Sequence, residues 1–142
     1  SGSQSISRSA LYGVAMKILT LIARILLGLG FVFFGLNAFL HFIPGSNMVP
    51  PGTAGQFSMA MAASHFDRVV AAFQIVAGVL LLIDLYVPLA LVLLGPILVN
   101  ILLFHLLMMP ATILPGIVFT VLWFIVFIRH RAAFAGIFAA KA

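Results

Sequence analysis

The chain of 142 residues contains no cysteine. It therefore forms no disulfide, has no thiolate metal site and has no cysteine nucleophile. Charge is scarce as well, since 6% of the residues are charged whereas a soluble domain usually carries about 25%. So few charges cannot cover a surface that faces water, and hydrophobic residues make up 65% of the chain. The sequence predicts an integral membrane protein whose apolar surface faces lipid.

Several functional motifs are also missing. The sequence has no Gly-rich phosphate loop, no G-x-S-x-G and no H-E-x-x-H. Its net charge of +5 is too scattered to form a nucleic-acid-binding stripe, so we exclude nucleic acid as a partner. The only acids, Asp67 and Asp84, lie at the ends of predicted spans, so a mid-membrane proton relay is weakly supported.

Four apolar segments have about the length that a transmembrane helix needs, which is roughly 20 residues. We therefore expect an all-α, four-helix membrane bundle that forms one transmembrane domain over residues 10–142. The predicted spans are residues 25–42, 69–85, 88–108 and 113–128.

Both ends of the chain extend beyond these spans. Residues 1–9 are polar and predict a disordered tail or a cloning remnant. Residues 10–24 predict an amphipathic lead-in at the membrane interface, because Lys17 and Arg24 lie seven residues apart and share one helical face. We expect both of these side chains to extend to the head groups. The tail over residues 132–142 is apolar and is expected at the interface.

The loop over residues 43–68 differs in composition from the spans. Prolines and glycines interrupt it, and its Met- and Ala-rich part predicts a short surface helix over residues 56–65. A connection of this length is uncommon unless it is functional, so the loop is a candidate functional element.

The basic residues predict the orientation of the bundle. Four spans place both termini on one side, together with Arg8, Lys17, Arg24, Arg129, Arg131 and Lys141. Only Arg68 lies on the other side. The positive-inside rule therefore predicts that both termini are cytoplasmic and that the long loop lies outside.

Polar residues within the spans are the candidate ligand-binding residues. Counted along the spans, they gather toward the outer ends of the first three helices, and they are Asn37, His41, Gln74, Asn100 and His105. Polar groups are costly in lipid and should face the bundle interior or a cavity. Uncharged donors and acceptors beside Phe34, Phe104 and Met108 suit a small neutral ligand such as a quinone.

Two other interpretations of these polar residues remain open. In one, they form hydrogen bonds between helices and bind nothing. In the other, His41, His65 and His105 meet around a metal ion, but their positions show no ligand spacing. We therefore assign no metal site.

Four segments also follow the pattern of a known family. They are RILLGLGFVFFGLNAF (24–39), QIVAGVLLL (74–82), YVPLALVLLGPILVNILLFHLLMMP (86–110) and LWFIVFIRHRAAFAGIF (122–138). Together they make the chain similar to the DoxX family of small bacterial membrane proteins. The resemblance implies four transmembrane helices in the bacterial cytoplasmic (inner) membrane.

The same resemblance implies a link to redox chemistry. Founding relatives are associated with a thiosulfate:quinone oxidoreductase, and others with membrane complexes that handle thiol stress. Many members have no assigned activity, and a distant animal branch acts as a receptor-assembly chaperone. This chain departs from its relatives at Ala38, where they often have Lys, and at Gln74, where they often have an acid.

Two classes of function follow from these observations. In the first, the protein is a small membrane subunit of a quinone-linked redox complex and has a polar pocket near the outer face. In the second, it is a non-catalytic structural or assembly subunit of a larger membrane complex. In both classes of function, the partners of the protein are the bilayer and other membrane subunits. Neither class identifies a catalytic residue, so the sequence leaves open whether the chain is an enzyme.

Overall fold

The structure is a computed structural model that describes the backbone of residues 2–141 and the side chains of residues 7–141. The described chain is helical and has no strand. The helices are α1 (Gly2–Leu40), α2 (Gly52–Ala63), α3 (Phe66–Ile83), α4 (Val87–Met108) and α5 (Leu114–His130), with short 3₁₀ turns η1 (Pro110–Thr112) and η2 (Arg131–Phe134).

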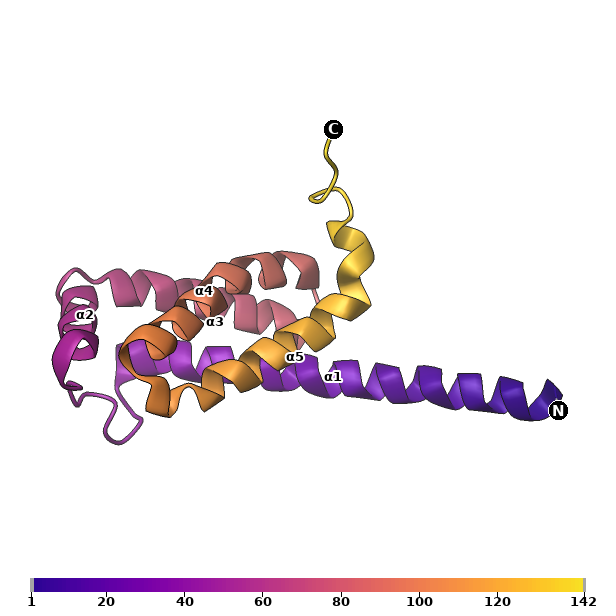
Figure 1. The fold of residues 1–142 in the computed structure, drawn as a ribbon, viewed down its shortest axis with the longest axis horizontal. Helices are drawn as coiled ribbons and strands as arrows, with labels where there is room; N and C mark the ends of the chain where they lie inside the picture. Colours follow the sequence, from indigo (N-terminus) through magenta and orange to yellow (C-terminus); the bar gives the residue numbers. More distant parts are fainter. Residues whose placement is uncertain (1, 142) are drawn as a thin grey trace.

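Four helices are long and apolar enough to cross a membrane. These segments are Ser7–Leu40, Phe66–Ile83, Val87–Met108 and Leu114–Phe134, so the protein is a multi-pass membrane protein and the expected number of four spans is confirmed. In Figure 1, α1, α3, α4 and α5 run along one another, and α2 lies across one end of the bundle. We call this the α2 end.

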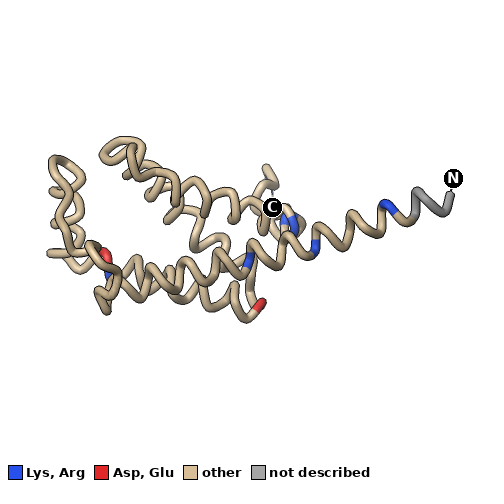
Figure 2. The backbone as a smooth tube through the Cα atoms, turned by 90° about the horizontal axis from the view of Figure 1, so that it is seen from below, with Lys and Arg blue, Asp and Glu red and all other residues tan. Residues whose placement is uncertain are grey.

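The opposite end of the bundle carries most of the charge, and we call it the basic end. Asp67 and Arg68 are neighbours in the first turn of α3, which follows α2 directly, and Figure 2 shows an acid and a base side by side there. All other Lys and Arg residues lie toward the basic end, where the described part of the chain begins and ends. The predicted segregation of charge between the two ends is therefore present in the structure.

Helix α1 differs from the expected division into a tail, a lead-in and a span. It is one helix from Gly2, so residues 2–9 are helical where we expected a disordered tail or a remnant. Once a helix is nucleated, each added residue contributes one backbone hydrogen bond, and no proline interrupts this segment. Residues 7–19 are all exposed and Thr20 is the first buried one, so α1 extends beyond the bundle (Figure 1).

Arg24 corrects the expectation that two basic side chains extend to the head groups. Its side chain is only 11% exposed and its Nε lies 3.6 Å from Oδ1 of Asp84. Its guanidinium also donates to the carbonyl oxygens of Leu81 and Leu82 at the end of α3. The last carbonyls of a helix lack partners within the helix, and a buried cation satisfies them better than lipid can. Lys17, by contrast, is exposed as expected.

The core contains aliphatic side chains from all four spans. The largest fully buried ones are Leu27, Leu81, Leu91, Leu94 and Val126. Large apolar residues on the outside, such as Leu29, Val76 and Val92, are about half exposed. In a bilayer this outer surface faces acyl chains, so its exposure does not oppose folding as it would in water.

Helices α1 and α3 approach each other at glycines. A Cβ atom added to Gly78 would lie 2.8 Å from the carbonyl oxygen of Gly28 and 2.7 Å from Cγ2 of Val32. One added to Gly35 would lie 3.0 Å from the carbonyl oxygen of Ala71. The two backbones are therefore in direct contact at antiparallel positions two helical turns apart, because small residues let helices approach closely in a membrane.

The long loop contains the expected short helix with different bounds. Helix α2 covers Gly52–Ala63, so it starts four residues before the predicted range of 56–65 and ends two residues before its end. Pro51 occupies its N-cap, where a missing backbone N–H costs nothing. His65 adopts a left-handed conformation between α2 and α3, where the chain turns from the end of the bundle into its length (Figure 1).

The C-terminal tail is anchored at one aromatic residue. Phe134, in η2, is 6% exposed and packs 5.0 Å from Phe127 of α5, measured between ring centroids. The residues from 135 to 141 are exposed, and in Figure 1 they lead away from the bundle. In the tail that was expected at the interface, Phe134 is thus part of the core.

Substitution of Gly78 by alanine tests the α1–α3 contact. We expect Gly78→Ala to lower the stability of the bundle by about 1–3 kcal/mol, because the added methyl overpacks a backbone contact. The measurement is thermal or denaturant unfolding in detergent, followed by circular dichroism. Gly13→Ala is the matched control, since nothing lies within 4 Å of its added Cβ. Equal stability of both variants would contradict the contact.

Candidate functional site

A cavity of about 500 Å³ lies between α2, α3 and α4, and we call it the α2–α4 cavity. Its walls are mostly apolar, with a few polar side chains. Helix α2 contributes Phe57, Ser58 and Met61, helix α3 contributes Phe66, Val70 and Gln74, and helix α4 contributes Ile97, Asn100, Ile101, Leu103, Phe104, His105, Leu107 and Met108. The long loop, expected to be a functional element, therefore supplies one wall through α2.

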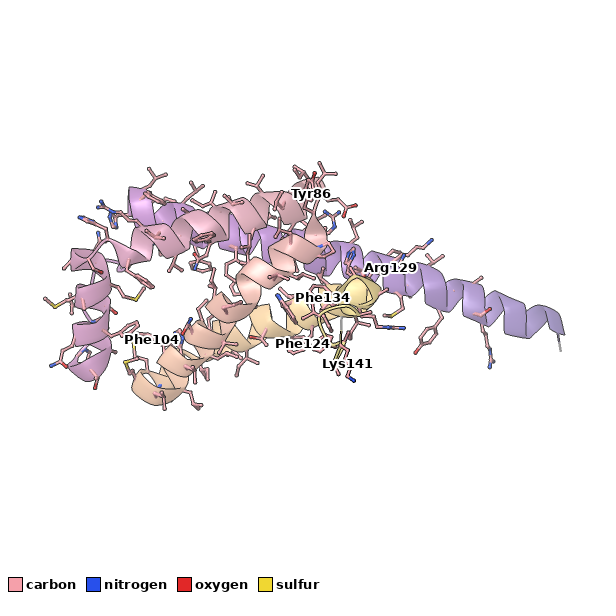
Figure 3. The ribbon with its side chains drawn as sticks, turned by 90° about the horizontal axis from the view of Figure 1, so that it is seen from above. Tyr86, Phe104, Phe124, Arg129, Phe134 and Lys141 are labelled. Atoms are coloured by element: carbon pink, nitrogen blue, oxygen red, sulfur yellow. The ribbon has the colours of Figure 1, made fainter. Side chains whose placement is uncertain are left out.

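Aromatic side chains connect α2 to the rest of the cavity. The ring centroids of Phe57 and Phe104 are 5.6 Å apart, and Phe104 meets His105 edge to face at 5.2 Å. Figure 3 shows Phe104 reaching from α4 into the space beside α2. Leu103 and Leu107 line the cavity and are also exposed, so the cavity opens at the lateral surface of α4.

Three of the five predicted ligand-binding residues line this cavity, and these are Gln74, Asn100 and His105. Gln74 follows the start of α3 by eight residues, and Asn100 precedes the end of α4 by eight. At 1.5 Å per residue, both lie roughly 12 Å below the α2 end. The prediction that these polar groups share one level holds for α3 and α4.

Hydrogen bonds define what His105 offers to a ligand. Its Nδ1 lies 2.8 Å from the carbonyl oxygen of Ile101. A carbonyl oxygen only accepts, so Nδ1 carries the proton and Nε2 of the neutral ring is an acceptor. The ring therefore presents a lone pair for a hydroxyl donor.

The two amides complement His105. Asn100 donates through Nδ2 to the carbonyl oxygen of Pro96 at 3.0 Å, which leaves its second N–H and its Oδ1 for other partners. Gln74 is half-buried and makes no side-chain hydrogen bond to another described residue. An amide in this position within a bilayer requires a partner, because lipid supplies none.

Asn37 and His41 lie outside the α2–α4 cavity, which corrects the prediction that they share the site. Oδ1 of Asn37 accepts a hydrogen bond of 2.8 Å from the backbone N–H of Ile43. His41 is exposed, has a φ of 51° and donates its backbone N–H to Asn37 O at 2.9 Å. Both residues terminate α1, so local backbone hydrogen bonding accounts for their position.

Phe34, expected to line the ligand site, also lies elsewhere. Its ring packs 5.5 Å from that of Phe33 and 6.0 Å from that of Phe119 on α5. It therefore belongs to the α1–α5 contact. Phe104 and Met108 line the cavity as expected.

The three outer histidines do not form a metal site in the described chain. No group of three or more His, Cys, Asp or Glu side chains within it is arranged to hold a metal ion. His65, like His41, occupies a left-handed turn position and is exposed.

The sequence reasoning did not identify the contribution of α2. Phe57, Ser58 and Met61 line the cavity although none was a candidate. The Met- and Ala-rich composition of this segment is a usable signal, since small residues and flexible methionines suit a helix that covers a cavity.

Comparison with known families supports the membership inferred from the sequence. The DoxX family model matches residues 19–106, which is more than half of the chain. The chain belongs to the DoxX family. The match covers most of α1, all of α2 and α3, and nearly all of α4, so the α2–α4 cavity is built from family-matched helices. It ends before α5, although the resemblance was expected to reach residue 138.

The search of curated proteins and the search of solved structures each found no match. Family membership and geometry are therefore the basis for any statement about this DoxX protein's function.

The helix-ending role of Asn37 is testable. We expect Asn37→Ala to lower the stability by about 1 kcal/mol, because the backbone N–H of Ile43 loses its partner. Thermal unfolding in detergent measures this change. Asn47→Ala removes an exposed amide from the same loop and serves as the control. A stable Asn37→Ala protein that loses a cavity ligand would show instead that Asn37 belongs to the site.

Proposed function

We propose that this DoxX protein is a small membrane subunit of a quinone-linked redox complex, and that the α2–α4 cavity binds the quinone ring. The observation that carries the proposal is the arrangement of Gln74, Asn100 and His105 around one cavity whose walls are apolar and aromatic. The volume of about 500 Å³ lies in the range of small-molecule sites, which runs from about 300 to 1,000 Å³.

Both redox states of a quinone find partners in this cavity. The carbonyl oxygens of the oxidised ring accept hydrogen bonds from the amide N–H groups of Gln74 and Asn100. The hydroxyl groups of the reduced ring donate to Nε2 of His105 or to an amide oxygen. The ring itself packs against Phe104 or Phe57, since offset and edge-to-face contacts favour aromatic pairs.

In this proposal the chain itself binds and orients the quinone and does not supply electrons. Reduction of a quinone consumes two electrons and two protons, and in this proposal the electrons come from a partner subunit. The absence of a fixed charge in the cavity wall suits a neutral ligand, because a buried charge would favour an ionic one.

Ligand titration tests the proposal. The protein in nanodiscs is titrated with a short-chain ubiquinone analogue, oxidised or reduced, and Kd is measured by calorimetry. We expect Gln74→Leu, Asn100→Leu and His105→Phe each to weaken binding by about 3- to 10-fold, which corresponds to one net hydrogen bond.

Thr120→Val is the matched control for this titration. Thr120 bonds the carbonyl oxygen of Gly116 at 2.7 Å, as His105 bonds Ile101, but it lies on α5 outside the cavity. The Kd of the Thr120→Val protein for the quinone analogue should equal that of the wild type. Absence of binding to the wild-type protein, or equal affinity of all four variants, would refute the quinone site.

A second function is favoured by one observation. The exposed part of α1 over residues 7–19 extends beyond the bundle and carries large apolar side chains such as Leu11, Val14 and Ile18. A non-catalytic assembly subunit would use this segment to dock other membrane subunits. Deletion of this segment would then abolish co-purification of partner chains and leave quinone binding unchanged.

We also propose that the protein lies in the bacterial inner membrane with its basic end in the cytoplasm. The segregation of Lys and Arg to one end supports this orientation. The α2–α4 cavity then opens in the outer half of the bilayer, where it meets quinone dissolved in the membrane.

The absence of native cysteine allows a direct test of orientation. We expect a membrane-impermeant maleimide to label Asn47→Cys in spheroplasts, because this loop lies outside. Lys141→Cys should be labelled only after lysis. The reverse labelling pattern would overturn the orientation and place the cavity in the inner half of the bilayer.

A further inference from the structure

A second cavity lies at the basic end, between α1 and the end of α5, and we call it the basic cavity. Its volume is about 360 Å³. Its lining residues are Met16, Thr20, Ile125, Ile128, Arg129, Arg131 and Ala132. It is separate from the α2–α4 cavity and shares no residue with it.

The lining of the basic cavity is divided by chemistry. Arg129 and Arg131 supply two guanidinium groups from the last turn of α5 and the first residue of η2. Met16, Ile125 and Ile128 supply an apolar wall from both helices. Figure 3 shows Arg129 on the side of α5 that meets α1. A ligand that fills this space needs an anionic group joined to an apolar part.

The two arginines have no acidic partner in the described chain. The ion pair found there joins Arg24 to Asp84, and the other acid, Asp67, lies at the α2 end. The guanidinium of Arg131 donates a long hydrogen bond of 3.4 Å to the carbonyl oxygen of Ile128. Both side chains are exposed, so an anion from outside the chain can reach these two positive charges.

Thr20 adds a constraint on the head group. Its hydroxyl donates to the carbonyl oxygen of Met16 at 2.9 Å, so its oxygen is left as an acceptor. The Thr20 proton is used in this bond, so the hydroxyl cannot donate it to a phosphate. The Thr20 oxygen can accept a hydrogen bond from a hydroxyl group of a ligand. With no acid in the lining, an ammonium group finds no negative charge there and lies beside two guanidinium groups that repel it.

We propose that the basic cavity binds the head group of one anionic phospholipid of the surrounding membrane, with its phosphate between Arg129 and Arg131. Guanidinium groups bind phosphate oxygens in a bidentate manner, and basic pockets between transmembrane helices bind anionic head groups. The acyl chains lie against Met16, Ile125 and Ile128, and a glycerol hydroxyl of the head group donates to Thr20. This site does not depend on the proposed quinone function.

Native mass spectrometry of the full chain in detergent tests the site. The purified protein is titrated with phosphatidylglycerol and, separately, with phosphatidylethanolamine of the same acyl chains. We expect one tightly bound phosphatidylglycerol per chain and at least 10-fold weaker binding of phosphatidylethanolamine. The double variant Arg129→Gln/Arg131→Gln should lose at least 10-fold in phosphatidylglycerol affinity.

Arg8→Gln is the control for loss of one positive charge, because Arg8 lies on the exposed part of α1 and does not line the cavity. It should bind phosphatidylglycerol like the wild type. If the double variant does not fold, as judged by circular dichroism, the single variant Arg131→Gln replaces it, since this side chain is exposed. A loss in Arg131→Gln of several-fold supports the proposal.

Three outcomes would overturn the site. Equal binding of the two lipids would remove the role of head-group charge. An equal loss in Arg8→Gln would show that net charge alone attracts the lipid. Displacement of phosphatidylglycerol by an equal concentration of inorganic phosphate would indicate a free-anion site in which the apolar wall has no role.

Discussion

The close contact between Gly28 of α1 and Gly78 of α3 is the constraint on which the rest of the bundle depends. The two backbones touch there, and Gly35 meets Ala71 two turns away in the same antiparallel register. Arg24 continues this register at the basic end, where it holds the last carbonyls of α3. Because lipid offers no hydrophobic drive for association, such backbone proximity and capping supply much of the packing energy. Helix α5 then joins α1 through Phe31 and Phe119, and α4 joins α3 in the leucine-rich core.

The two ends of the bundle offer different chemistry. At the α2 end, amides and an imidazole without formal charge line an apolar, aromatic cavity. At the basic end, guanidinium groups line a smaller space between α1 and α5. The α2 end thus suits neutral, lipid-soluble molecules, and the basic end suits charged head groups. The separation follows from the placement of charge along the chain, because the charged residues lie near one end of the bundle or beyond it and the middle of the four spans has none.

The sequence predicted features that depend on position along a helix and was less successful with those that depend on rotation or on local caps. Span number, family and the shared depth of Gln74 and Asn100 follow from hydropathy and residue counting. Asn37 and His41 lie nearer the α2 end, where the last turn of α1 uses their side chain and backbone to end the helix, and no periodicity reveals such a bond. Arg24 was expected at the lipid surface because hydropathy does not show which helix end lies opposite it. The contribution of α2 required knowledge of how the loop folds back over α3 and α4.

The exposed position of Leu103 and Leu107 on the wall of the α2–α4 cavity has a consequence for exchange with the surroundings. A hydrophobic occupant reaches this opening from the acyl-chain phase, in which it is far more concentrated than in water. The relevant supply is then the mole fraction of that molecule in the bilayer. Occupancy consequently varies with the ratio of lipid to protein at constant total ligand, and dilution of the membrane with inert lipid empties the cavity even when nothing in the aqueous phase changes.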